Sequence, residues 1–209
     1  MGHSTLLNSR LPRLLFITEH ARCGGDVFFH RLEAALKGGV DTVLVREKQM
    51  DSARLLAFCA RLRELTGAHD ARLIVHTQAD IAAAVDADGV HVAANDIPRI
   101  AALRTWLDAP EMCMSASCHD AGELNAAAAA GVDFALLSPV FPTASHPGAA
   151  HIGVARFRDL AAQSPLPVVA LGGIDVQNRG ELAGFSVAVI SAILDATDAQ
   201  KAAVDLLAE

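Results

Sequence analysis

Residues 130–137 read Ala-Gly-Val-Asp-Phe-Ala-Leu-Leu: the end of an alanine-rich helix, a glycine and then an apolar strand. Glycine after a helix takes the left-handed conformation that ends it, so the next strand can begin at once. The same junction recurs at Gly38-Gly39, before Val40-Asp41, and at Asp88-Gly89. A junction that repeats along a chain predicts a series of helix-to-strand units.

Eight short β-rich runs can be read along the chain, and an Ala- and Leu-rich helical stretch follows each of them. The expected strands are Leu14–Thr18, Asp41–Arg46, Arg72–His76, Asp88–Val92, Met112–Ala116, Asp133–Leu137, Leu166–Leu171 and Ser186–Ile190. The expected helices are Val27–Lys37, Ser52–Thr66, Gln78–Val85, Pro98–Leu107, Asp120–Ala130, Val154–Gln163, Val176–Leu182 and Ala199–Ala208.

Eight such units predict an α/β fold, a single (β/α)8 TIM barrel. Sharing 209 residues among eight units gives about 26 residues each, which leaves no room for a second domain. We expect one barrel domain over residues 11–209, preceded by a flexible N-terminal arm over residues 1–10.

Composition excludes several classes of protein. Half of the residues (52%) are apolar, which excludes disorder. The net charge of −7, without a basic run, argues against nucleic-acid binding. We find no 18-residue apolar stretch and no signal peptide, so we expect no membrane span and a cytoplasmic location. The four scattered cysteines predict reduced, buried thiols, and the Ala-rich helices would allow a homodimer.

Ligands of such a barrel bind where the strands end. Gly172-Gly173 follows the seventh strand and Ser191-Ala192 follows the eighth, and these four residues form the expected phosphate site. Arg46 and Lys48 follow the second strand with the same parity, so both can face one anion. The plainer alternatives are a tight turn at the glycines, and a solvated charge run bridged by Glu47 at the second strand.

Histidines follow three other strands. His119 follows the fifth strand and is a candidate general acid/base, whereas Asp120 beside it has the residue type of a helix N-cap. Cys118 as a nucleophile is the weaker interpretation. His76 and His91 suggest a metal, but their spacing fits no ligand motif, and His91 also fits a hydrogen-bonded core residue. The long loop at residues 138–148 is either a lid or a plain connection.

Taken together, the strand ends resemble the thiamin phosphate synthase and thiazole tautomerase (TenI-like) superfamily, in order from about Leu14 to Leu194. The resemblance implies a barrel that binds a thiazole phosphate. The synthase joins hydroxymethylpyrimidine diphosphate to the thiazole phosphate, uses magnesium, passes through a pyrimidine cation and expels diphosphate. The tautomerase moves a proton without a metal. The residues that carry the resemblance are 16–19, 45–48, 88–91, 117–119, 138–143, 170–174 and 187–193.

The match is uneven at the end that would hold magnesium diphosphate. Arg46 and Lys48 match two members of a Gln-x-Arg-x-Lys motif, whose Gln falls on Leu44. Asp96 matches one magnesium carboxylate. The Asn-Asp-Arg that supplies the other carboxylate aligns with His76-Thr77-Gln78, and the loop Lys aligns with His146. The resemblance further implies His119 as the acid/base group, and Ser117, Thr143, Ser145 and His146 as substrate-binding residues.

These departures remove charge from the pyrimidine half of the site and leave the phosphate site whole. The leading prediction is therefore a tautomerase-like enzyme acting on a thiazole phosphate, with His119 as acid/base and no cofactor. The close alternative is a working synthase with an altered magnesium site. Two further alternatives are a non-catalytic binder of thiazole phosphate and another phosphosugar-type barrel isomerase.

Overall fold

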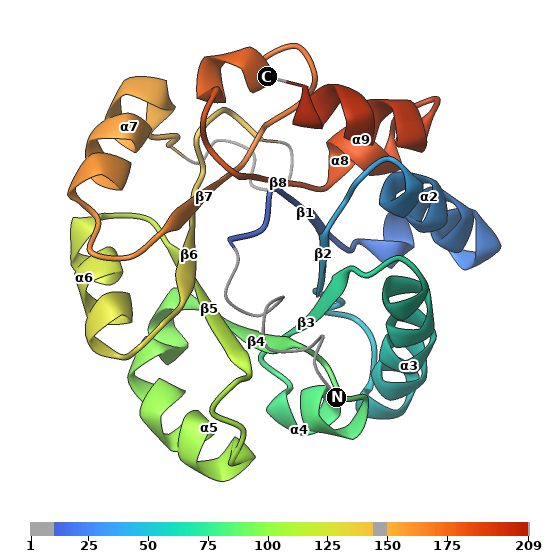
Figure 1. Cartoon of the computed structure of the whole chain (residues 1–209), viewed down its shortest axis with the longest axis horizontal. Helices are drawn as coiled ribbons and strands as arrows, with labels where there is room; N and C mark the ends of the chain where they lie inside the picture. Colours follow the sequence, from blue (N-terminus) through green and yellow to red (C-terminus); the bar gives the residue numbers. More distant parts are fainter. Residues whose placement is uncertain (1–10, 144–149, 209) are drawn as a thin grey trace.

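The computed structural model describes residues 11–143 and 150–208, which form a closed barrel of eight parallel strands in sequence order. Figure 1 shows the strands at the centre and the helices as an outer ring. All eight expected strands and the predicted (β/α)8 barrel are confirmed. The strands are β1 Leu14–Ile17, β2 Thr42–Val45, β3 Arg72–His76, β4 Gly89–Val92, β5 Cys113–Cys118, β6 Phe134–Leu137, β7 Val168–Leu171 and β8 Val187–Val189.

The outer ring contains seven of the eight expected helices. They are α2 Gly25–Lys37, α3 Ser52–Ala68, α4 Ala79–Ala84, α5 Ile100–Leu107, α6 Ala121–Ala129, α7 Gly153–Gln163 and α9 Ala199–Leu207. The short α8, Ser191–Leu194, follows β8. The described residues also form three 3-10 helices: η1 His20–Arg22, η2 Ala94–Arg99 and η3 Arg179–Leu182.

The helix predicted over Val176–Leu182 is wrong, because only its last four residues form η3. The Asp175 carboxylate accepts hydrogen bonds from the N–H groups of Gln177 and Asn178, at 2.8 and 3.1 Å. The Asn178 side chain in turn accepts the N–H of Asp175 at 3.0 Å. Such side-chain bonds offer the backbone an alternative to helix, and here they replace its first turn.

The glycine junctions are confirmed at two of their three places. Gly39 and Gly131 have φ of 103° and 79°, the left-handed conformation expected after a helix. Gly89 instead lies inside β4, and Asp86, with φ of 52°, takes the left-handed position after α4. A Cβ on Gly89 would lie 2.6 Å from the carbonyl oxygen of Cys113. Gly89 is therefore needed for the close approach of β4 to β5.

Two apolar clusters hold the barrel together. The larger cluster lies between strands and helices, with Phe16, Phe28 and Phe157 fully buried. The smaller cluster fills the barrel itself with side chains of alternate strand positions, including Leu15, Leu44, Ile74, Phe134 and Val169. This packed interior confines any ligand site to the barrel ends.

Aspartates secure the amino-terminal end of the barrel, where the strands begin. Asp41, Asp88 and Asp133 precede even-numbered strands, and each carboxylate accepts a backbone N–H from the preceding strand or its approach, at Arg13, Leu73 and Met114. Asp88 also forms an ion pair with Arg63, and Asp133 forms one with Arg104. The aspartate before each of β2, β4 and β6 thus forms a side-chain hydrogen bond to the odd-numbered strand that precedes it, or to the approach of that strand.

The thiol predictions hold in part. All four cysteines are free, and Cys59, Cys113 and Cys118 are buried, whereas Cys23 is half-exposed. Burial raises the pKa of each of the three buried thiols to about 12. A thiol with that pKa carries almost no thiolate at neutral pH, so the nucleophile interpretation of Cys118 is not supported.

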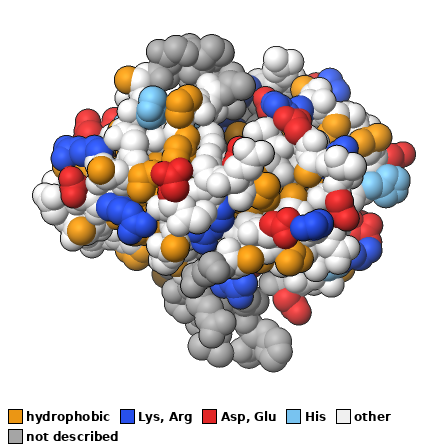
Figure 2. Space-filling model, turned by 90° about the horizontal axis from the view of Figure 1, so that it is seen from above, with side chains coloured by type: hydrophobic (Ala, Val, Ile, Leu, Met, Phe, Trp, Pro, Cys, Tyr) orange, Lys and Arg blue, Asp and Glu red, His pale blue; other side chains and the backbone are white. Residues whose placement is uncertain are grey.

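The exterior is mixed in character. Figure 2 shows acidic and basic side chains interspersed with apolar ones over the face it draws. Within residues 11–143 and 150–208, no helix combines the length and the apolar character needed to cross a membrane.

Candidate active site

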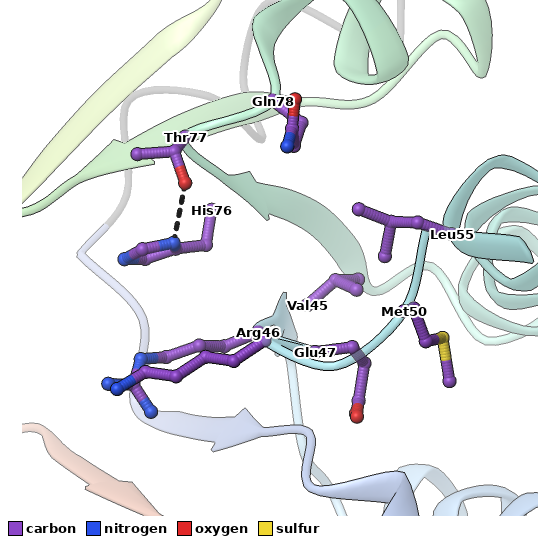
Figure 3. A pocket seen from close by; sticks show the side chains of 9 residues that line it. Val45, Arg46, Glu47, Met50, Leu55, His76, Thr77 and Gln78 are labelled. Carbon is purple, nitrogen blue, oxygen red and sulfur yellow. Dashed lines mark hydrogen bonds between the residues drawn. The ribbon is translucent and has the colours of Figure 1, made fainter. Parts of the chain in front are cut away.

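A pocket of about 250 Å³ opens where β2 and β3 end, at the carboxyl-terminal end of the barrel. Figure 3 shows its side chains converging from the segments after these two strands. We call it the cationic pocket, and its lining is Val45, Arg46, Glu47, Lys48, Met50, Leu55, His76, Thr77 and Gln78.

Arg46 and Lys48 supply the positive charge of this pocket. Arg46 directly follows β2 and has the parity of the inward-facing Leu44. Its backbone N–H donates to the buried Thr18 hydroxyl at 3.0 Å, which fixes the point where the chain leaves the barrel. Among the described residues, neither Arg46 nor Lys48 has an ion-pair or side-chain hydrogen-bond partner.

Glu47, between the two cations, faces away from them. Its Oε1 accepts the backbone N–H of His20 at 2.8 Å, and Figure 3 shows it on the opposite side of the chain from Arg46. Glu47 therefore does not bridge Arg46 and Lys48, which excludes the alternative of a bridged charge run. Arg46 and Lys48 both line the pocket, and their binding of one anion stays a prediction.

His76 ends β3 inside the same pocket. Its Nδ1 is 2.7 Å from the hydroxyl of Thr77. Burial, followed by the charges of Arg46 and Lys48, lowers the pKa of His76 to about 4, against an opposing effect of Asp96. The ring is therefore neutral at physiological pH, and the two cations are close enough to act on it. The sequence suggested a metal-binding role for His76 and did not place its side chain in the cationic pocket with Arg46 and Lys48.

His91 is a hydrogen-bonded core residue, as one of its two interpretations predicts. It is 1% exposed, and its Nδ1 and Nε2 lie 2.9 Å from the hydroxyls of Ser115 and Ser117. Burial, followed by His76 and Arg46, lowers its pKa to about 3. Its ring centroid lies 5.7 Å from that of His76. Ser117, predicted to bind substrate, is thereby linked through His91 to the cationic pocket.

The predicted phosphate site lies after the neighbouring strands β7 and β8, which pair at Leu171 and Ala188. The four residues Gly172, Gly173, Ser191 and Ala192 are all at least partly exposed. No hydrogen bond between described residues uses the N–H of Gly173, Ser191 or Ala192. These donors are unused within the described part of the chain, and phosphate binding there stays a prediction.

The two glycines also have a structural reason. Gly172 and Gly173 have φ of 104° and 66°. A Cβ on Gly173 would lie 2.3 Å from the carbonyl oxygen of Pro142, and one on Gly172 would lie 2.7 Å from Cα of Pro139. The segment after β6 therefore crosses directly over Gly172-Gly173, and the tight-turn alternative is part of the explanation as well.

His119 directly precedes Asp120, the N-cap of α6, and its side chain contacts the first turn of that helix. Its side chain is 52% exposed, and its Nδ1 lies 2.8 Å from Glu123 Oε2, which also accepts the His119 backbone N–H at 2.7 Å. Asp120 accepts the N–H of Glu123 at 2.9 Å, which confirms the N-cap prediction. Sequence reasoning did not identify Glu123 as the partner of His119, although its spacing from Asp120 is that of a capping box.

The remaining predicted residues divide into two groups. Thr143 is described and half-buried, whereas Ser145 and His146 lie outside the described residues, as does the predicted arm at residues 1–10. Asp96 forms an ion pair with Arg99 at 3.2 Å. It acts on His76 electrostatically but does not line the cationic pocket.

The donor set does not fit a magnesium ion held by the protein. Within residues 11–143 and 150–208, no three His, Cys, Asp or Glu side chains come together in a way that could hold a metal. Asp96 is paired with Arg99, and the Thr77 hydroxyl is bonded to His76. Magnesium prefers carboxylates, but the described lining of this pocket offers one, Glu47, whose Oε1 accepts the His20 N–H, beside two unpaired cations and a histidine.

Comparisons with known proteins agree with the resemblance drawn from the strand ends. The family model described as thiamine monophosphate synthase matches residues 14–194. A putative thiamine-phosphate synthase of Geobacter sulfurreducens is 37% identical over 93% of this chain and 92% of its own length. A thiamine-phosphate synthase of Methanococcus vannielii is 37% identical over 81% of this chain and 82% of its own length.

Solved structures agree as well. Thiamine phosphate pyrophosphorylase from Pyrococcus furiosus superposes with a TM-score of 0.83 at 33% identity, over 96% of this chain and 95% of its own. A 3-hexulose-6-phosphate synthase, at 20% identity and a TM-score of 0.67, shares the fold alone. The named relatives support the synthase alternative rather than the leading tautomerase-like prediction.

Proposed function

This chain belongs to the thiamine monophosphate synthase family, and from that premise we propose that it is itself a thiamine-phosphate synthase. It would join hydroxymethylpyrimidine diphosphate to a thiazole phosphate and release diphosphate. The observation that supports this most strongly is the pair of cations, Arg46 and Lys48, in one pocket without a carboxylate partner among the described residues. Unpaired cations that converge on one pocket favour a multiply charged anion.

This pocket discriminates between the two family activities. A thiazole tautomerase acts on one phosphorylated ring, so the phosphate site after β7 and β8 would suffice for it. A synthase must hold a second, diphosphate-bearing substrate at the same barrel mouth. The cationic pocket lies after β2 and β3, separate in the barrel order from β7 and β8. Two separate anion sites match a two-substrate reaction.

The residues of this chain divide the work of that reaction. The bond from the pyrimidine methylene carbon to the diphosphate oxygen breaks, and its electron pair leaves with diphosphate. Arg46 and Lys48 stabilise the negative charge that develops there, an effect worth about 3 kcal/mol per well-placed donor. The thiazole nitrogen then gives its electron pair to the methylene carbon. The N–H groups of Gly173, Ser191 and Ala192 hold the thiazole phosphate in position.

His119 has no step in this scheme, because its Nδ1 is engaged by Glu123 and no proton transfer is required. The assignment of His119 as acid/base applies only to the tautomerase-like reaction. His119→Ala separates the two activities, since it should abolish tautomerisation and leave diphosphate release largely intact.

The test is an assay with both substrates and the purified protein. We expect thiamine phosphate and diphosphate in equal amounts, and a loss of both on the order of 10² or more in kcat/KM with Arg46→Ala. Exposed His30→Ala serves as the matched surface control. Absence of both products, with or without magnesium, would overturn the proposal. Proton exchange on a thiazole carboxylate phosphate that requires His119 would instead support the tautomerase.

A further inference from the structure

The cationic pocket contains a histidine at the place where the family motif has the first residue of its Asn-Asp-Arg. His76 lines the pocket together with Arg46 and Lys48. Figure 3 shows its ring beside the Arg46 side chain, with the nitrogen that is not bonded to Thr77 turned toward the same side as the guanidinium. No hydrogen bond between described residues uses His76 Nε2. A ring nitrogen is therefore available in a pocket built for an anion.

Thr77 orients this ring at a conformational cost. Its φ is 60°, a left-handed conformation that is rare for a β-branched residue. The turn is held by the Thr77 N–H, which donates to the carbonyl of His91 at 2.8 Å, and by the Gln78 N–H, which donates to the carbonyl of His76 at 2.7 Å. Strain of this kind persists only where surrounding contacts maintain it, and it gathers at functional sites. Here it places the Thr77 hydroxyl on His76 Nδ1.

That contact is compatible with either direction of the hydrogen bond, because a threonine hydroxyl can donate to Nδ1 or accept from it. When the hydroxyl donates, the proton of the neutral ring lies on Nε2. The Nε2–H then points into the pocket as a third donor beside the two cations.

We propose that His76, oriented by Thr77, binds the substrate diphosphate together with Arg46 and Lys48, and that these three side chains hold it without a divalent cation. This inference rests on the proposed function and deepens it. Its basis is geometric: His76 lines one pocket with two cations, Asp96 is paired with Arg99 outside that lining, and the one carboxylate of the described lining, Glu47, accepts the His20 N–H through Oε1.

Binding of diphosphate should be coupled to the uptake of a proton by His76. The charged and titratable groups that act on His76 are Arg46 and Lys48 after β2, His91 in β4 and Asp96 in η2. In the free protein, burial and the two cations lower the pKa of His76 to about 4. A bound diphosphate offsets those cations and raises the pKa of His76 above its value in the free protein, so the complex holds more protons than the free protein does. By linkage, affinity should rise as pH falls from 7 toward 5.

The first experiment measures binding of inorganic diphosphate by calorimetry in EDTA and again with magnesium, on the whole protein. We expect tight binding in EDTA that magnesium changes by less than about twofold. His76→Asn should weaken binding in EDTA about tenfold, the loss of one charge-assisted hydrogen bond. At pH 6 this variant should also take up fewer protons than the native protein. His30→Asn, an exposed change on α2, should alter neither quantity.

Thr77→Val, which keeps the shape and removes the hydroxyl, is the second variant. Nitrogen NMR of the His76 ring should show the proton on Nε2 in the native protein and a mixture of tautomers in Thr77→Val. Diphosphate binding that requires magnesium, or an affinity unchanged in His76→Asn, would overturn this inference. If thiamine phosphate still forms, the proposed function is not affected by that result. No diphosphate binding and no product under either condition would overturn both. Thermal unfolding of each variant identifies a folding defect, in which case the native protein's magnesium dependence and ring tautomer decide.

Discussion

The two ends of this barrel treat charge in opposite ways. At the amino-terminal end, the carboxylates of Asp88 and Asp133 each accept a backbone N–H and pair with an arginine. At the carboxyl-terminal end, Arg46 and Lys48 have no such partner among the described residues, and the glutamate between them bonds elsewhere. The Asp88 and Asp133 carboxylates at the first end are satisfied within the chain, whereas the Arg46 and Lys48 side chains at the second have no partner among the described residues.

This difference separates stability from function along one axis. Satisfied bonds between neighbouring strands stabilise the closed barrel. Burial, followed by the charges of Arg46 and Lys48, lowers the pKa of His76, and neither cation forms an ion pair among the described residues that would stabilise the fold. Substitutions at the amino-terminal end should therefore change the free energy of unfolding, whereas those at the carboxyl-terminal end should change kcat/KM.

The largest expected effect is on activity at the carboxyl-terminal end. Arg46→Ala combined with Lys48→Ala should lower kcat/KM for the diphosphate substrate by more than about 10³, since each removes a donor worth roughly 10²–10³. The free energy of unfolding should change by less than about 0.5 kcal/mol. Steady-state kinetics and urea unfolding measure the two. Equal losses of activity in Arg63→Ala, at the other end, would contradict the division.

The next largest effect is expected for a substitution of Gly173. This residue has a structural role in the turn after β7 and a predicted role in phosphate binding. Gly173→Ala should destabilise the fold by about 3 kcal/mol or more, because a left-handed backbone and a Cβ in contact with Pro142 both cost energy. Gly184 is the matched control, since it has φ of 82° and a Cβ added there would meet nothing within 4 Å. Gly184→Ala should cost about 1–2 kcal/mol and leave activity intact. Identical unfolding curves for the two variants would show that the overlying segment yields easily.

At the amino-terminal end, Asp88→Ala should lower the free energy of unfolding by about 1.5–3 kcal/mol, because it breaks charge-assisted bonds to Leu73 and Arg63. Asp133→Ala should cost less, since that side chain is 48% exposed against 19% for Asp88. Neither should change kcat/KM of the folded enzyme. A catalytic defect in Asp88→Ala at a temperature where it is fully folded would break the comparison.

The smallest effect belongs to the barrel interior between the two ends. His91 stays neutral in the folded protein, with a pKa of about 3, and gains a proton near pH 6.5 once unfolded. Acid therefore favours unfolding: the stability present above pH 6.5 is lost toward pH 3, with a slope of up to about 1.4 kcal/mol per pH unit. Urea unfolding at pH 7 and pH 5 should show a smaller pH effect in His91→Gln than in the native protein. His30→Gln should match the native slope.

Much of this site could be read from residue order. The parity of Arg46 with Leu44 placed that side chain at the barrel mouth, because side chains alternate along a strand. The glycines after β7 followed from the same reasoning about strand ends. The orientation of Glu47 did not, since it depends on the N–H of His20, which is distant in sequence. The sequence did not identify Glu123 as the partner of His119. The residues at the start of that helix predicted only Asp120 as the N-cap.

Hydrophobic periodicity, glycine junctions and strand parity were sufficient for the barrel and its eight strands, because these depend on neighbours a few residues apart. Only the tertiary structure decided which charges stay unpaired, which amide groups stay free and how His76 is held by Thr77. Those properties depend on contacts between β1, β2, β3 and β4 and on burial, which change a side chain's partners and its pKa without any change in the residues beside it.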